Sequence, residues 1–150
     1  MSPIPPFNEV GDLPPGVHQA TLIEVTELLG QGSAQRRVAA QRLQRIREVA
    51  VQTGHLARFI VFGSFVTTHP EPNDIDVFLL LDNTFNAEGL RGEAAVLFNH
   101  SLAQTYFGAS VFWLRRAAAL GGEEAMIEHW QIKRDGTHRG ILEVVAGDQE

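Results

Sequence analysis

The chain has 150 residues, of which 44% are hydrophobic and 20% are charged, and its formal net charge is −6. This composition predicts one soluble domain with an apolar core, and no run approaches the roughly 18 apolar residues of a membrane-spanning helix. The acidic balance argues against binding of nucleic-acid duplexes over the whole surface. The lack of cysteine excludes disulfides and thiolate zinc sites. The opening residues do not resemble a signal peptide, so we expect a cytoplasmic protein.

The first third of the chain is expected to be an arm followed by helices. Residues 1–18 are rich in proline and glycine, which predicts an extended arm. Residues 19–54 are expected to form a helical element, with one helix over 19–30. A second helix is expected to follow Ser33, a favourable N-cap, and to continue to about Gln52, since apolar residues recur there at helical spacing.

That second helix carries a cluster of arginines, including Arg36 and Arg47. Such a cluster could contact RNA or an acidic partner. Because Arg36 and Arg47 fall off the apolar face, the favoured interpretation is a solvated helix surface.

Residues 55–150 alternate strand and helix patterns and are expected to form the core of the domain. A turn at Asp135-Gly136 favours a C-terminal hairpin. The predicted class is therefore α/β (α+β), a short mixed sheet flanked by helices in one domain over residues 1–150. The expected strands cover 57–62, 75–81, 109–114 and 140–145, and the expected helices cover 87–105 and 122–130.

The informative passage lies between the first two strands. Gly63-Ser64 ends one strand, and Asp74-Ile75-Asp76 opens the next after nine intervening residues. Glycine there lets the backbone turn sharply and approach a ligand closely, and a helical turn after it would present N–H groups and the Ser64 hydroxyl to a phosphate. Residues two apart on a strand point to the same face, so the carboxylates of Asp74 and Asp76 are expected to lie together.

Two carboxylates on one face favour a cation between them. Mg²⁺ prefers oxygen ligands and commonly takes one or two carboxylates together with substrate phosphates. Phosphoryl-type transfer depends mainly on positioning and on neutralisation of charge, which such a site would supply. Taken singly, each residue is more simply a turn or surface residue, but a charge at Asp76 inside an apolar strand is costly unless it has a partner.

The arrangement Gly63-Ser64-x9-Asp74-x-Asp76 resembles the signature of the polymerase-β-like nucleotidyltransferase superfamily, in particular its minimal nucleotidyltransferase members. The usual motif has about one more residue in the gap. Residues 11–18 are also similar to a group of small bacterial nucleotidyltransferase-like proteins. The resemblance implies that Gly63 and Ser64 bind the nucleotide and that Asp74 and Asp76 are catalytic residues that bind Mg²⁺.

The superfamily normally has a third carboxylate on the next core strand. The matching position here is expected to be Ser110, and a serine cannot replace a metal-binding carboxylate. Two hypotheses therefore stay open. The first is an Mg²⁺-dependent nucleotidyltransferase that moves a nucleoside monophosphate from an NTP, ATP being favoured, to a hydroxyl of a protein, an RNA or a small molecule. The second is a degenerate binding protein without catalysis.

The resemblance also implies possible partners, because minimal nucleotidyltransferases often act as antitoxins of helical HEPN ribonuclease toxins. A toxin that modifies tRNA is a third possibility, and it would arrest growth when expressed alone. The remaining candidates are weaker: His69 is expected to be a solvated loop residue, and Trp113 and Trp130 are expected to serve packing.

Overall fold

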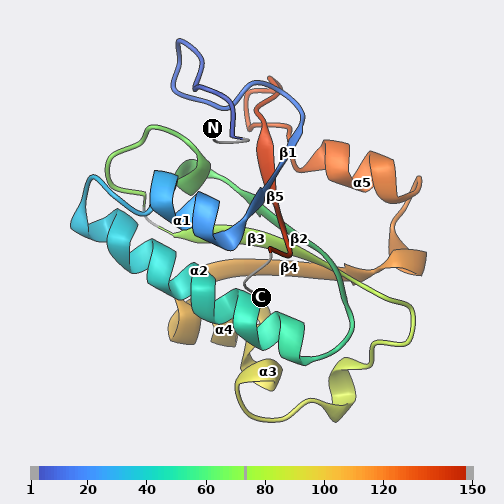
Figure 1. Ribbon diagram of the computed structural model, residues 1–150. Coiled ribbons are helices and arrows are strands. Elements are labelled where there is room, and N and C mark those ends of the chain that lie inside the picture. The colour runs from blue at the N-terminus through green and yellow to red at the C-terminus, as the bar shows by residue number, and fades with distance from the viewer. Residues whose placement is uncertain (1–3, 73, 148–150) are drawn as a thin grey trace.

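A mixed sheet forms the centre of the computed structural model, which describes residues 4–72 and 74–147 (Figure 1). The strand order in the sheet is β1-β5-β2-β3-β4. Strand β2 is antiparallel to both of its neighbours, whereas the pairs β1–β5 and β3–β4 are parallel. The mixed α/β class expected from the sequence is confirmed. The strands are β1 (Val17–Thr21), β2 (Leu56–Phe62), β3 (Ile75–Leu81), β4 (Ala109–Arg115) and β5 (Ile141–Val145).

Helices cover the two faces of the sheet unequally. Two apolar clusters lie on opposite faces, and the larger one contains the buried residues of α1 to α4, whereas the smaller one contains those of α5. In Figure 1, α5 lies at the right of the view, apart from the other helices. The helices are α1 (Leu22–Leu29), α2 (Ala34–Gln52), α3 (Gly92–Leu97), α4 (His100–Phe107) and α5 (Glu123–His129), with short 3₁₀ turns η1 (Ser64–Val66), η2 (Ala87–Gly89) and η3 (Arg116–Ala118).

Strand β3 is apolar at nearly every position because both of its faces are covered. Ile75, Val77 and the other odd-numbered residues pack into the larger cluster. Phe78 and Leu80 point to the opposite face, against Ile127 of α5. Since alternate residues share a face, Asp76 belongs to the face that α5 only partly covers.

An ionic contact attaches α5 to that face. The Arg58 guanidinium on β2 bonds to Glu123 at the start of α5, with an Nη1–Oε2 distance of 3.0 Å, and to Glu143 on β5, with an Nη2–Oε1 distance of 2.8 Å. The Glu143 side chain is only 9% exposed. The Arg58 guanidinium is thus paired on both sides, and its contact with Glu123 helps to hold α5 against this face of the sheet.

The first predicted helix, over 19–30, is wrong at its beginning. Residues 17–21 form β1 and pair in parallel with β5, and the helix begins only at Leu22. The reason is a capping box, in which the Thr21 hydroxyl accepts a hydrogen bond from the Glu24 N–H and the Glu24 carboxylate accepts one from the Thr21 N–H. The second helix is confirmed, including its Ser33 N-cap.

The helix predicted over 87–105 is confirmed only in part, because the segment is helical but breaks into η2, α3 and α4. Gly92 has a φ of +63°, and Asn99 starts α4 as an N-cap that accepts a hydrogen bond from the Leu102 N–H. The turn at Asp135-Gly136 closes one isolated bridge, Ile132 to His138, and β5 pairs with β1 and β2 rather than with a hairpin strand.

The predicted solvation of Arg36 and Arg47 is also wrong, since their exposed fractions are 6% and 9%. Arg36 extends from α2 to backbone carbonyl groups of the neighbouring segments rather than into solvent. Among the described residues, no helix is both long and apolar enough to cross a membrane.

Candidate functional site

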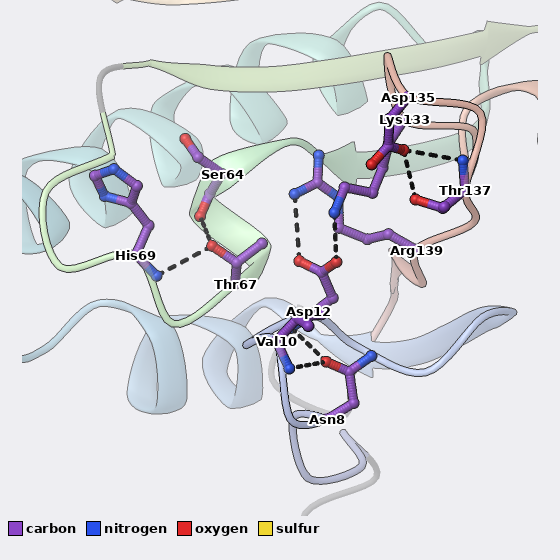
Figure 2. Close-up of polar contacts among 10 residues, drawn as sticks. All are labelled: Asn8, Val10, Asp12, Ser64, Thr67, His69, Lys133, Asp135, Thr137 and Arg139. Atoms are coloured by element: carbon purple, nitrogen blue, oxygen red, sulfur yellow. Dashed lines mark hydrogen bonds and ion pairs between the residues drawn. The ribbon is translucent and has the colours of Figure 1, made fainter.

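Gly63 turns the chain at the end of β2. Its φ of +79° and ψ of −162° lie in a region that residues with a Cβ rarely adopt. The 3₁₀ turn η1 follows at once, closed by a hydrogen bond from the Val66 N–H to the Gly63 carbonyl. The Thr67 hydroxyl donates to the Ser64 carbonyl at 2.6 Å, which fixes Ser64 at the start of this turn. Figure 2 shows Ser64 and Thr67 on the same short turn.

Arg36 of α2 holds the loop that carries Ser64. Its guanidinium donates to the carbonyl oxygens of Phe65 at 3.0 Å and of His69 at 2.6 Å, and also to that of Thr67. It also reaches the Leu29 carbonyl at 3.1 Å. Burial lowers the pKa of Arg36, and the four carbonyls around it compensate for the lost water. A side chain outside the loop therefore adds to the hydrogen bonds within it that hold its conformation.

Asp74 and Asp76 lie at the entrance to β3, as the sequence predicts. Asp76 is opposite Phe62 on β2 and opposite Ser110 on β4. The carboxylate of Asp76 lies directly against the Cα of Gly63, so that a methyl group in place of the glycine hydrogen would collide with it. The glycine turn and the acidic strand thus meet at one point, and the absence of a side chain at residue 63 is what permits the contact.

The charge of Asp76 is disfavoured in the folded chain. Burial raises the pKa of Asp76, and the negative charge of Asp74 raises it further, to about 6, although Arg139 and a hydrogen bond from Ser110 act in the opposite direction. A divalent cation between the two carboxylates would relieve the repulsion between them. Among residues 4–72 and 74–147, no group of three or more acidic, His or Cys side chains is placed to hold a metal ion, so Asp74 and Asp76 would need phosphate oxygens or water as further ligands.

Ser110 occupies the register position that the sequence predicts. Its hydroxyl hydrogen-bonds to Asp76 across the parallel pair β3–β4. The group opposite Asp76 is therefore a neutral hydroxyl, which can orient the carboxylate but cannot add a negative charge to a metal site.

Three residues near this site are not predicted from the sequence: Asp12, Lys133 and Arg139. In Figure 2 the Asp12 carboxylate faces both cations, with one oxygen toward each. The distance is 2.9 Å from Asp12 Oδ2 to the Lys133 Nζ and 3.5 Å from Asp12 Oδ1 to the Arg139 Nη1. The Asp12 side chain is 8% exposed. Asp12 also forms an isolated bridge with Thr67 of the Ser64 loop. No motif spacing could reveal this cluster, because Asp12 is more than a hundred residues from both cations.

His69 has a local structural contact. Its Nδ1 accepts a hydrogen bond from the Glu71 N–H at 3.0 Å, and its ring is exposed, which agrees with the expected loop residue.

A cavity of about 280 Å³ lies between α2 and the entrance to β3, and Asp74 and Arg42 are among its lining residues.

The arrangement joins a sharp glycine turn, two carboxylates at the entrance to β3 and two cations that Asp12 holds beside the same turn. Searches among curated proteins and among solved structures found no match. A sequence profile matches residues 5–145, which is nearly the whole chain. The chain therefore belongs to a family of unknown function, DUF6932.

Proposed function

We propose that this protein is an Mg²⁺-dependent nucleotidyltransferase with a nucleotidyltransferase-like fold. Asp74 and Asp76 bind the metal, and Gly63 and Ser64 bind the triphosphate. The observation that carries the proposal is the contact between Gly63 and the Asp76 carboxylate. A phosphate placed on the glycine turn would lie beside the Asp76 carboxylate. The raised pKa of Asp76 indicates that its negative charge is not fully compensated by neighbouring groups.

The cations beside the turn support the same assignment. Lys133 and Arg139 lie with Asp12 next to the Ser64 loop, and the charge of Arg139 acts on Asp76. A nucleoside triphosphate carries several negative charges, which require cations close to the point where they bind. Lys133 and Arg139 would supply such cations, together with the Mg²⁺ that Asp74 and Asp76 would hold.

In the proposed reaction, the oxygen of an acceptor hydroxyl forms a bond to the α-phosphorus of the nucleotide. The bond from that phosphorus to the bridging oxygen breaks, pyrophosphate leaves with the electron pair, and the acceptor proton passes to solvent. The metal supplies neutralisation of the phosphate charge when it is bound. Ser64 and its turn hold the triphosphate, while Ser110 orients Asp76.

The test is calorimetric titration with ATP, GTP, CTP and UTP, with and without Mg²⁺, followed by transfer of a labelled nucleotide. We expect Mg²⁺-dependent binding in the wild type and its loss in Asp76→Asn and in Asp74→Asn/Asp76→Asn. Glu124→Gln, a change of one exposed carboxylate on α5, serves as the control. Binding and transfer that persist in Asp76→Asn would disprove the assignment of the metal site.

A second candidate function is a binding protein without turnover, such as an antitoxin partner of a HEPN-type toxin. The neutral Ser110 opposite Asp76 favours it, since no third carboxylate is available there to activate an acceptor. This candidate predicts Mg²⁺-dependent nucleotide binding in calorimetry and no labelled product with protein, RNA or small-molecule acceptors.

A further inference from the structure

An aromatic cluster continues the acidic site along the same face of the sheet. Phe78 and Phe112 follow Asp76 and Ser110 by two residues on β3 and β4, and they are opposite each other in register. Trp130, directly after α5, packs against both rings, with centroid distances of 5.2 Å to Phe78 and 5.1 Å to Phe112.

This cluster borders an open cavity of about 550 Å³ between β3, β4 and α5. That volume falls within the range of small-ligand pockets. Among the described residues that line it there is no Asp, Glu, Lys or Arg, and Phe112 is 37% exposed. The cavity is therefore suited to a flat, uncharged ring. Its walls include Phe78, Phe112, Leu114, Met126, His129 and Trp130.

The cavity and the acidic site follow one another along the strands in a fixed order. Ser64 lies beyond the end of β2, Phe62 is opposite Asp76, and Ile60 is opposite Phe78. Two residues on a strand span about 7 Å, so the aromatic rings begin roughly that distance from the Asp76 position. The order along the sheet is phosphate turn, acidic pair, aromatic cavity.

We propose that this cavity binds the purine base of the nucleotide, an inference that rests on the proposed function. A nucleoside triphosphate has the same order of parts, because its triphosphate, ribose and base follow in line. With the triphosphate at Ser64 and the α-phosphate at the acidic pair, the base reaches Phe112 and Trp130. Aromatic side chains bind bases through stacking, which needs no charged group in the pocket.

The experiment separates the base from the phosphates by using three probes: MgATP, adenosine and Mg²⁺-tripolyphosphate. Phe112→Leu keeps an apolar side chain and removes the ring, and Phe112→Trp restores a stacking surface. Tyr106→Leu is the matched control, since Tyr106 is an exposed aromatic residue on α4 outside the cavity. Affinities come from calorimetry, thermal unfolding confirms that each variant is folded, and tryptophan fluorescence reports occupancy of the cavity beside Trp130.

We expect Phe112→Leu to weaken MgATP binding about tenfold, which corresponds to the loss of one stacking contact, and to leave tripolyphosphate binding unchanged. Phe112→Trp should restore the affinity for MgATP. Tyr106→Leu should change neither the affinity for MgATP nor that for tripolyphosphate. Equal MgATP affinity in the wild type and in Phe112→Leu, with tripolyphosphate still bound, would overturn the base site and leave the proposed function standing. Saturable adenosine binding that Phe112→Leu removes, without any phosphate-dependent binding, would support the base site and overturn the proposed function. No binding of any probe would overturn both.

Discussion

Asp76 is a residue at which folding and the proposed function oppose each other. Its pKa rises from 3.8 in a free side chain to about 6 in the folded chain, first because of burial and then because of Asp74. Between these two values the unfolded chain has released the proton while the folded chain keeps it, so stability falls as the pH rises from about 4 to about 6. A shift of this size, reduced for partial exposure, corresponds to about 2 kcal/mol.

We therefore expect Asp76→Asn to be more stable than the wild type at pH 7 without Mg²⁺, by about 2 kcal/mol, and the difference to vanish near pH 4. Urea unfolding from pH 4 to pH 7 measures it. Asp82→Asn provides a contrast of opposite sign, because hydrogen bonds from Thr84 and then from His55 lower the pKa of Asp82, and the stability that it contributes is lost as the pH falls. A wild-type curve parallel to that of Asp76→Asn would contradict the assigned shift.

Gly63 is the second residue whose identity is required by its surroundings. Gly63→Ala places a methyl group against the Asp76 carboxylate and forces a φ of +79° on an L-residue. Gly32→Ala is the matched control, since Gly32 has a φ of +98° but, within the part of the chain that the structure describes, no heavy atom lies within 4 Å of the added methyl. Backbone strain alone costs of order 1–3 kcal/mol, so both variants lose stability.

We expect Gly63→Ala to lose at least about 1 kcal/mol more than Gly32→Ala, because Asp76 must also move, and the double variant Gly63→Ala/Asp76→Ala to recover that excess. Urea midpoints at constant slope provide the measurement. Equal losses in the two single variants would mean that Asp76 does not rest on Gly63.

At the scale of elements, α2 does more than cover the sheet. Its apolar period identifies the helix correctly from the sequence, but it says nothing of Arg36, whose long side chain passes beneath the helix to the Ser64 loop. The apolar pattern shows which residues face the core, but it does not show which groups a long charged side chain will contact. The beginning of α1 is missed for a related reason, since β1 exists through its pairing with β5, about 120 residues away in the chain.

Arg36→Met should destabilise the chain by about 3 kcal/mol, because four carbonyl oxygens lose a charged donor in a buried place. Arg37→Met, at the next and exposed position of α2, is expected to change the stability by less than about 0.5 kcal/mol. Hydrogen exchange of the amides of residues 65–69 should rise in Arg36→Met at concentrations of urea where the protein stays folded. Unchanged exchange in that loop would show that other contacts hold it.

At the scale of the whole molecule, the sequence predicts the parts of the site that are close together in the chain. Gly63, Ser64, Asp74 and Asp76 lie within fourteen residues, at the adjoining ends of two strongly apolar strands, so their spacing can be predicted. The aromatic cavity depends on α5 returning to the sheet, and the cations depend on the segment before β5. Neither has a signal in local sequence, because each is formed by tertiary contact alone.

Asp12 joins three distant segments beside the site. Its carboxylate binds Lys133 and Arg139, Thr68 donates a backbone hydrogen bond to the Gly11 carbonyl, and Gly140 donates one to the Leu13 carbonyl. Residues 11–13 therefore connect the Ser64 loop to the segment that precedes β5. Replacing Asp12 takes from two partly buried cations the carboxylate that binds both of them, which is more costly than the loss of an exposed pair.

We expect Asp12→Asn to destabilise the chain by about 2–3 kcal/mol, less than a fully buried pair because Lys133 and Arg139 are 29% and 24% exposed. Glu128→Gln breaks the exposed contact of Glu128 with His138 and should cost less than about 0.5 kcal/mol. A double-mutant cycle of Asp12→Asn with Lys133→Met, followed by urea unfolding, should give a coupling of about 1–2 kcal/mol, since the second change removes a cation that the first leaves unpaired. Additive effects would mean that Asp12 acts through the backbone contacts of residues 11–13, and that Lys133 is already free to meet a phosphate.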